Sequence, residues 1–483
     1  MHSKSWHCLM VIMVASCALV TAENIPYHQT DFPPEEFKAR WEVVFHKIGD
    51  HAVAILQGSP RTNGFIFPRQ TNDFYYTCGI ETPGSYILLD GRSHKVTLYL
   101  PARDARLESA EGKVLSANDA DLVKSLTGAD EVLGTEAMRE GWLRSSTGEV
   151  PQEIYTPFAP AEGAEQSRYE LMDSNAAIAG DYWDGRIPRE ANLVALLRAR
   201  FWGSQVKDLT PIIDEMRSVK SPREIELLRR AAQLAGHGLL EAMHSTKPGI
   251  YEYQLEAAAR YVYLTNGARL EGYRSIIAAG VDNIWNMHYY RNSRQIKPDD
   301  LLLMDYAPDY HNYVSDITRM WPAGGKFSAT DRELLGFVLA YRNAVMQRIR
   351  PGVTPIQIQE EAKAAMEPVF ARTKFSKPIY EQAVHKLVDT GGGIFSHPVG
   401  MAVHDDGDYA HGLLKPGHVF SIDPQLRVPE ENRYLRYEDV IVITANGYEN
   451  FTDFLPTELN DLEKQVGQGG VLQKEPAVLP ETK

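Results

Sequence analysis

The stretch Leu301–Asp305, LLLMD, places a carboxylate directly after an apolar run, and residues 419–423, VFSID, repeat the pattern later in the chain. A third acid, Glu438, stands just before the apolar run 440–443. Apolar runs of this length are typical of buried strands. A carboxylate at the end of a buried strand is costly unless it is paired or bound to a cation. These segments therefore predict a site built on strand ends in the second half of the chain.

The acids form two pairs that hairpins can bring together. Asp316 lies eleven residues after Asp305, and Glu438 lies fifteen after Asp423. Neither spacing puts both acids on one face of a single strand, but an antiparallel hairpin can set them opposite each other. Four carboxylates that converge in a dry site cannot all stay ionised without compensating positive charge.

The residues alone leave two sources of that positive charge open. Two divalent cations about 3.5 Å apart would balance the carboxylates and hold a bridging hydroxide. One histidine, His397, beside four oxygen ligands suits Mn²⁺, with Co²⁺ or Zn²⁺ as substitutes, better than a thiolate-type site does. The structural alternative is a set of buried ion pairs with Arg319 or Arg436.

An internal sequence repeat, which we call the internal echo, suggests that the second half contains a duplicated unit. Residues 247–257, KPGIYEYQLEA, resemble residues 350–360, RPGVTPIQIQE. Each copy reads as a basic-Pro-Gly stop after one helix, followed by the start of another. Strand-like segments rich in carboxylates follow each copy, at 301–319 and 419–444. A duplicated half would bring ligands to one centre from two sides.

Length and pattern predict two domains. At 483 residues the chain is too long for one ordinary core. Apolar runs at 52–56, 85–89 and 96–100, with helical patterns at 36–48, 116–126 and 187–201, predict an α/β domain of roughly 180 residues. A domain boundary falls near 208–211. A long helix is predicted to begin after it, because Ser221 suits the N-cap and is followed by Pro222 and by acids in the first turn. We predict a signal peptide at 1–22, domains at 23–207 and 208–461, and a mostly disordered tail at 462–483.

Composition and charge exclude some classes of protein. With 43% hydrophobic and 24% charged residues, the chain fits a soluble globular protein. A net charge of -14 without a basic block argues against a nucleic-acid partner.

The N-terminus predicts export, to a periplasm or out of the cell. Residues 1–8 carry Lys4 and no acid, 9–20 form a twelve-residue apolar run, and 20–22, VTA, offer a cleavage site. The run is too short to span a bilayer comfortably, although a fixed signal anchor is an alternative. Residues 14–17, VASC, also look like a bacterial lipoprotein box. In that case a lipid anchor on Cys17 would be the one membrane contact.

The cysteines provide no internal disulfide framework. Cys8 and Cys17 lie in the signal region, which leaves Cys78 alone in the rest of the chain. Residues 74–79, FYYTCG, read as a buried strand, and we interpret Cys78 as a structural thiol rather than a nucleophile.

Four segments resemble the pita-bread metallopeptidases, which include methionine aminopeptidase, prolidase and aminopeptidase P. The segments 304–319, 396–405, 420–424 and 436–439 contain MDYA, YVSDITR, SHPVG, VHD, FSIDP and RYED in that family's order. The pseudo-symmetric duplication of that fold also explains the internal echo. Residues 67–79, FPRQTNDFYYTCG, resemble the N-terminal domain of aminopeptidase P, which methionine aminopeptidase lacks. The implied architecture is α/β, with a creatinase-like N-terminal domain before a pita-bread catalytic domain.

The resemblance implies a dinuclear metal site with five protein ligands. Asp305 would bind one ion, and His397 and Asp423 would complete the other. Asp316 and Glu438 would bridge both. The ions would most naturally be manganese, with cobalt or zinc as alternatives.

The resemblance also assigns residues that contact substrate. His404 matches a histidine that steadies the tetrahedral intermediate, and His288 matches another histidine of the active site. Asp423 or Glu438 would move the proton, and Arg436 would hold neighbouring carboxylates in place.

Two positions depart from the family pattern. Asp423 stands where better-known members have glutamate, which puts its role as a base in doubt more than its metal binding. Gly393 stands four residues before His397, where aminopeptidase P typically has another histidine, so one substrate contact is missing.

The implied activity is hydrolysis of the bond between an N-terminal residue and a following proline. Prolidase, which cuts Xaa-Pro dipeptides, is the nearest alternative, together with other hydrolases of the fold. A non-catalytic pita-bread binding protein and a metal-free creatinase-like hydrolase are further alternatives, disfavoured because all five ligand types are present. The resemblance also implies a homo-oligomer, a dimer or a tetramer, paired through the N-terminal domain.

Overall fold

The computed structural model describes residues 26–474 except 62–65, 140–141, 145–147 and 408. The predicted signal peptide, with Cys8 and Cys17, lies outside the described residues. Within them, no helix combines the length and apolarity needed to cross a membrane.

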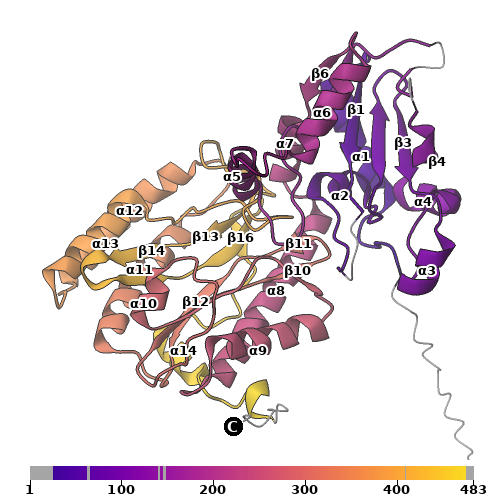
Figure 1. The fold of residues 1–483 in the computed structure, drawn as a ribbon. Helices are drawn as coiled ribbons and strands as arrows, with labels where there is room; N and C mark the ends of the chain where they lie inside the picture. The colour runs from indigo at the N-terminus through magenta and orange to yellow at the C-terminus, as the bar shows by residue number, and fades with distance from the viewer. Residues whose placement is uncertain (1–25, 62–65, 140–141, 145–147, 408, 475–483) are drawn as a thin grey trace, which may run out of the picture.

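The first half is built on one six-stranded sheet, in the order β4-β3-β2-β1-β5-β6 (Figure 1). Its central strands β1, β2 and β3 pair antiparallel, and the outer pairs are parallel. The strands are β1 (Ala52–Gln57), β2 (Tyr86–Asp90), β3 (Lys95–Leu100), β4 (Glu131–Gly134), β5 (Glu153–Thr156) and β6 (Gln205–Asp208). The helices of this half are α1 (Pro34–Ile48), α2 (Asn72–Cys78), α3 (Ala105–Glu111), α4 (Ala120–Thr127), α5 (Arg168–Ala179) and α6 (Arg189–Arg200). The first three strands and the helices α1, α4 and α6 confirm the predicted pattern.

One predicted strand is wrong. Residues 74–78 belong to helix α2, which ends at Gly79 in the left-handed region, with φ of 66°. Every residue of α2 is buried, so the segment lacks the polar face that distinguishes a helix from a buried strand. Burial raises the pKa of the Cys78 thiol to about 12, in keeping with a structural role.

The second half contains two similar units. Helices α8 (Pro222–Ser245) and α9 (Glu252–Thr265) precede the sheet β12-β9-β8, and α11 (Ala329–Met346) and α12 (Pro355–Arg372) precede the sheet β13-β16-β17. The echoed Pro-Gly segments lie at corresponding places, between α8 and α9 and between α11 and α12. The predicted long helix is α8, which begins at a capping box formed by Ser221 and Glu224.

The other elements of this half complete the two units. The strands are β7 (Leu270–Glu271), β8 (Ile276–Ala279), β9 (Leu301–Asp305), β10 (Pro308–Tyr310), β11 (Tyr313–Val314), β12 (Thr318–Pro322), β13 (Val419–Ile422), β14 (Gln425–Val428), β15 (Arg433–Arg436), β16 (Asp439–Ile443) and β17 (Tyr448–Asn450). The remaining helices are α7 (Thr210–Ser218), α10 (Gly280–Trp285), α13 (Pro378–Thr390) and α14 (Leu459–Gln465).

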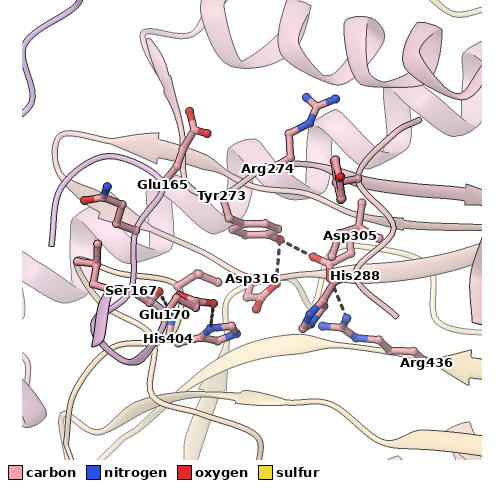
Figure 2. A pocket seen from close by; sticks show the side chains of 15 residues that line it. Glu165, Ser167, Glu170, Tyr273, Arg274, His288, Asp305, Asp316, His404 and Arg436 are labelled. Carbon is pink, nitrogen blue, oxygen red and sulfur yellow. Dashed lines mark hydrogen bonds and ion pairs between the residues drawn. The ribbon is translucent and has the colours of Figure 1, made fainter. Parts of the chain in front are cut away.

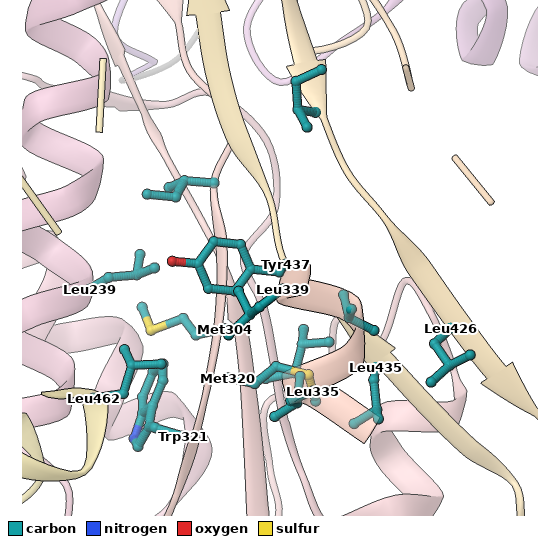
Figure 3. Packing of buried hydrophobic residues seen from close by; sticks show 14 of the residues in the cluster. Leu239, Met304, Met320, Trp321, Leu335, Leu339, Leu426, Leu435, Tyr437 and Leu462 are labelled. Carbon is teal, nitrogen blue, oxygen red and sulfur yellow. The ribbon is translucent and has the colours of Figure 1, made fainter. Parts of the chain in front are cut away.

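The core of the second half lies directly behind the strand ends that carry the acids. Met304 and Tyr437 pack with Trp321 and Leu335 in one apolar cluster (Figure 3). Met304 immediately precedes Asp305, and Tyr437 immediately precedes Glu438. Because neighbouring residues of an extended chain point to opposite sides, burying the apolar residue directs the acid away from the core.

The prediction of a mostly disordered tail from residue 462 is wrong as far as residue 474. Helix α14 runs through this point, and Leu459 and Leu462 are buried in the core of the second half. Glu463 also forms an ion pair with Lys326, with 2.8 Å between Oε2 and Nζ. The polar composition of the segment hid its short apolar face. Residues 475–483 lie outside the described part of the chain.

Buried charges join the two halves. Arg217 of α7 is 1% exposed. Its Nη1 lies 2.8 Å from Asp73 and 3.2 Å from Glu162, both in the first half, and its Nη2 pairs with Asp405 in the second. One guanidinium therefore ties both halves together close to His404.

Replacing Arg217 should unfold the junction. Arg217→Met leaves three buried carboxylates short of a partner, so we expect the free energy of unfolding in urea to fall by about 3–5 kcal/mol. Arg186→Met is the matched control, because Arg186 pairs with Asp184 at the surface with 76% of its side chain exposed. The control should change stability by no more than about 0.5 kcal/mol. Equal losses in both variants would contradict the role of Arg217.

Candidate metal centre

The β9–β12 hairpin brings Asp305 and Asp316 close together, as predicted. The two acids are not directly opposite each other, however, because the register of the hairpin is shifted. Asp305 lies opposite Thr318 in the β9–β12 ladder, and Asp316 lies in the segment just before β12. The Tyr273 hydroxyl joins the two acids, with Oη 2.6 Å from Asp305 Oδ1 and 2.8 Å from Asp316 Oδ1. One hydroxyl carries one proton, so it cannot donate fully to two ionised carboxylates. At least one of the two carboxylates therefore lacks a full hydrogen bond from Tyr273.

Two groups of side chains could each hold a metal ion. Oxygen atoms of Asp305, Asp316 and Glu438 all lie within 4.8 Å of one another, and so do ligand atoms of Asp316, His397 and His404. Asp316 belongs to both groups, as expected of a bridging ligand. His404 was predicted to contact substrate rather than metal.

Asp423 lies beside these groups but in neither of them. Its Oδ1 is 3.0 Å from Arg436 Nε, and its Oδ2 accepts a hydrogen bond from Gln425 Nε2 at 2.5 Å. Asp423 and Glu438 are thus linked by their shared contact with Arg436, and Asp423 is not part of either ligand group.

Arg436 is the central cation of the site. Its guanidinium lies 2.8 Å from Asp305, 3.0 Å from Asp423 and 2.5 Å from Glu438. Arg319 does not take part in the same way, because it pairs with Asp439 at 2.6 Å. The ion-pair interpretation is therefore correct for Arg436, but one positive charge cannot neutralise four acids.

The electrostatics favour additional cations. Burial raises the pKa of Asp305 and Asp316, and it raises the pKa of Asp423 to about 8. Burial also acts on Glu438, but the charge of Arg436, together with the hydrogen bonds from Ser421 and Thr318, outweighs it and holds the pKa of that carboxyl below its usual value. Three of the four acids thus resist ionisation until further positive charge arrives.

The donor set fits divalent cations that prefer oxygen with one nitrogen. His397 Nδ1 lies 3.1 Å from the carbonyl oxygen of Pro398, which can only accept, so Nδ1 carries the proton. Nε2 then presents its lone pair 3.3 Å from Asp316 Oδ2. Burial lowers the pKa of His397 to about 4, which keeps the ring neutral at neutral pH. A backbone carbonyl that fixes the tautomer in this way is typical of metal-binding histidines.

Glu438 is oriented by its neighbours. The Ser421 hydroxyl donates to Oε1 at 2.5 Å, and the Thr318 hydroxyl donates to Oε2 at 2.8 Å. Ser421 comes from β13 and Thr318 from β12, so the carboxylate is held by both units of the duplicated half.

A cavity of about 510 Å³ opens onto the acids (Figure 2). His288, from the loop after α10, and His404 both line it, as do Asp305 and Asp316. Four of the predicted site residues therefore line the cavity, whereas His397, Asp423 and Glu438 contact this group without lining the cavity themselves. One side of the cavity comes from residues 165–167 and the first turn of α5, which belong to the first half of the chain.

Sequence reasoning missed three kinds of contact. Tyr273 carries no local motif, and Tyr169 and Glu170 of α5 lie more than two hundred residues from the histidine that they contact. Gln425 was within reach of prediction, because it stands two residues after Asp423. An added Cβ at Gly393 would lie 3.3 Å from Gln425 Nε2, so the glycine leaves room for this carboxamide.

Gln425 should contribute to metal affinity by holding Asp423. Gln425→Ala removes the donor to Oδ2, and we expect metal affinity to fall by roughly tenfold or more. Competition with a chromophoric chelator measures that affinity directly. Gln357→Ala is the control, because Gln357 contacts Glu361 on the exposed face of α12. Unchanged affinity in Gln425→Ala would mean that Asp423 is held by Arg436 alone.

Both halves of the chain match known protein families. Residues 226–445 match the model of metallopeptidase family M24, and residues 37–149 match that of the aminopeptidase P N-terminal domain. Xaa-Pro aminopeptidase of Escherichia coli strain K12 is 28% identical, over 89% of this chain and 97% of its own length. The mitochondrial intermediate cleaving peptidase 55 of Arabidopsis thaliana is also 28% identical, over 89% of this chain and 82% of its own.

A solved structure agrees with the whole fold. Zinc-substituted E. coli aminopeptidase P in complex with product superposes with a TM-score of 0.69 at 25% identity, and the match covers 90% of this chain and 98% of that one. The family matches cover the duplicated half that carries the five predicted ligands and the strands β1 to β4 of the first half. Residues 226–445 are thus assigned to metallopeptidase family M24, and they follow an aminopeptidase P N-terminal domain at residues 37–149.

Proposed function

We propose that this protein is an aminopeptidase that releases the N-terminal residue from peptides whose second residue is proline. The observation that carries the proposal is the clustering of Asp305, Asp316, Glu438 and a neutral His397, with Asp305 and Asp316 lining the cavity. It occurs in a metallopeptidase of family M24 that also has the aminopeptidase P domain. The E. coli relative, which matches over 97% of its own length, is named Xaa-Pro aminopeptidase.

We assign two divalent ions to the site. Asp305 would hold one, His397 and Asp423 the other, and Asp316 and Glu438 would bridge them. An oxygen-rich set with a single imidazole favours Mn²⁺, with Co²⁺ and Zn²⁺ as substitutes. Held by these residues, the ions would supply a water that ionises near neutral pH and would polarise the scissile carbonyl.

The chain's own residues would position the peptide and stabilise charge. His404 lines the cavity, and as an imidazolium, with a proton on each ring nitrogen, it can donate from Nε2 to the oxyanion that develops on the carbonyl oxygen. His288 lies on the same cavity and would contact the peptide from the side of α10. The proton would move through Asp423 or Glu438, the acids next to Arg436. Proline lacks an N–H and has a fixed φ, so its bond requires a site shaped for the ring.

Peptide hydrolysis tests this proposal directly. The protein without residues 1–22, loaded with Mn²⁺, should release the first residue from Xaa-Pro-Yaa tripeptides faster than it cuts an Xaa-Pro dipeptide. Asp305→Ala removes a ligand, so we expect kcat/KM to fall by roughly a thousandfold or more together with the metal content. Asp299→Ala is the control, because Asp299 is exposed and lies outside both ligand groups.

The other outcomes identify the alternatives. Preference for the dipeptide would make the protein a prolidase. Metal binding without cleavage of either peptide would mean that Asp423 and Gly393 direct the site to a different substrate. A protein that binds no metal would have a non-catalytic or creatinase-like role.

We further propose that the protein is exported and works as a homo-oligomer, a dimer or a tetramer. The charged start, the apolar run and the VTA site at 20–22 support export to a periplasm or to the outside. Mass spectrometry of the protein from its host should find an N-terminus at Glu23. A lipid on Cys17 would instead identify a lipoprotein, and an intact Met1 would contradict cleavage. Light scattering would give the oligomeric state.

A further inference from the structure

The first turn of α5 holds His404 at three points. Tyr169 Oη lies 2.7 Å from His404 Nδ1, and Glu170 Oε1 lies 3.2 Å from the same nitrogen. The backbone N–H of His404 donates to Ser167 Oγ at 3.3 Å. The Tyr169 ring also packs against the imidazole, with 5.2 Å between ring centroids. Figure 2 shows Ser167 and Glu170 beside His404 at the edge of the cavity.

This helix is not held in place by an apolar face. Of its twelve residues, only Arg168 is buried. Ser167 stands at the N-cap, where a serine usually bonds to its own helix, but it makes no such bond. Its hydroxyl accepts from His404 instead. A helix without a buried apolar face would not stay docked through the hydrophobic effect, so its position depends on polar contacts.

Arg168 fixes this turn to the rest of the molecule. Its Nη1 lies 2.7 Å from Asp214 Oδ1 in α7, and its Nη2 lies 3.3 Å from Glu162 and 3.0 Å from Asp406. Asp406 follows His404 by two residues. The same guanidinium therefore holds the helix and the loop that carries His404 in one arrangement.

The chemistry at Nδ1 sets the state of the imidazole. An ionised carboxylate only accepts hydrogen bonds, so a contact between Glu170 and Nδ1 requires a proton on Nδ1. The Tyr169 hydroxyl also reaches Glu170 and would donate to it. With Nδ1 taken up in this way, Nε2 is left for the cavity. The imidazole also contacts the ring of His397 edge-on, with 4.3 Å between centroids.

We propose that Glu170, supported by Tyr169, is a positioning residue for His404 that keeps the proton on Nδ1 and turns Nε2 toward the substrate. A helix of the N-terminal half thereby becomes part of the apparatus that acts on the peptide. The role of His404 toward the carbonyl rests on the proposed function, whereas the contacts of its ring do not.

Kinetics of isosteric variants test this assignment in the full Mn²⁺-loaded chain. Glu170→Gln weakens the acceptor without changing its shape, so we expect kcat on an Xaa-Pro-Yaa tripeptide to fall by about tenfold, with KM within about twofold. Asp173→Asn removes one charge from the exposed part of the same helix and should leave both constants unchanged. Equal effects of the two variants would overturn the proposal, because helix charge alone would then explain them.

A double-mutant cycle separates positioning from a structural role. If Glu170 acts through His404, Glu170→Gln should have no further effect on kcat in a His404→Ala background. Multiplied losses in the double variant would mean that Glu170 acts independently, and they would overturn the proposal.

A spectroscopic measurement keeps the inference testable without peptide hydrolysis. In the diamagnetic zinc-loaded chain, long-range ¹H–¹⁵N spectra report which ring nitrogen of His404 carries the proton, and His404→Ala assigns the signal. We expect the Nδ1–H form in the wild type and a changed proton distribution in Glu170→Gln. Identical spectra would overturn the positioning role. If the wild type cuts no proline peptide, the proposed function fails while this spectrum still decides the role of Glu170.

Discussion

The interaction on which the structure depends is the repulsion among buried acids that share one arginine. Arg436 touches Asp305, Asp423 and Glu438, yet a single positive charge leaves the site strongly acidic. Desolvation makes that excess charge expensive, as the raised pKa of Asp423 reflects. A cluster of this kind persists in a fold only when the surrounding strands hold it rigidly, and it gains most from binding divalent cations.

The duplicated fold provides that rigidity. Each unit ends a buried strand next to an acid, and the apolar residue before the acid is anchored in the common core. Ser421 and Thr318, from different units, hold the two oxygens of Glu438. The free energy that opposes the repulsion among the acids therefore comes from the packing of the whole core of the second half, and not from local contacts alone.

The first half of the chain contributes directly to the site. Arg217 and Arg168 bind acids from both halves, and α5 reaches the cavity wall beside His404. Ion pairs that are fully desolvated are sensitive to geometry, so they fix the relative placement of the halves more strictly than apolar contacts would. Gln425 plays a similar part on a smaller scale, because it occupies the space beside Gly393 and holds the shorter acid Asp423.

The sequence by itself determined the fold class, the duplicated half and the candidate ligands, since apolar periodicity and acids at strand ends are local signals. It failed for the helix at 72–78 and for the tail, because complete burial removes periodicity and a short apolar face is lost in a polar segment. Only the tertiary structure decided which three acids Arg436 contacts, that Arg319 pairs with Asp439 instead, and that Glu170 contacts His404. Such contacts join residues that are distant in sequence, and their energies depend on burial that no local pattern encodes.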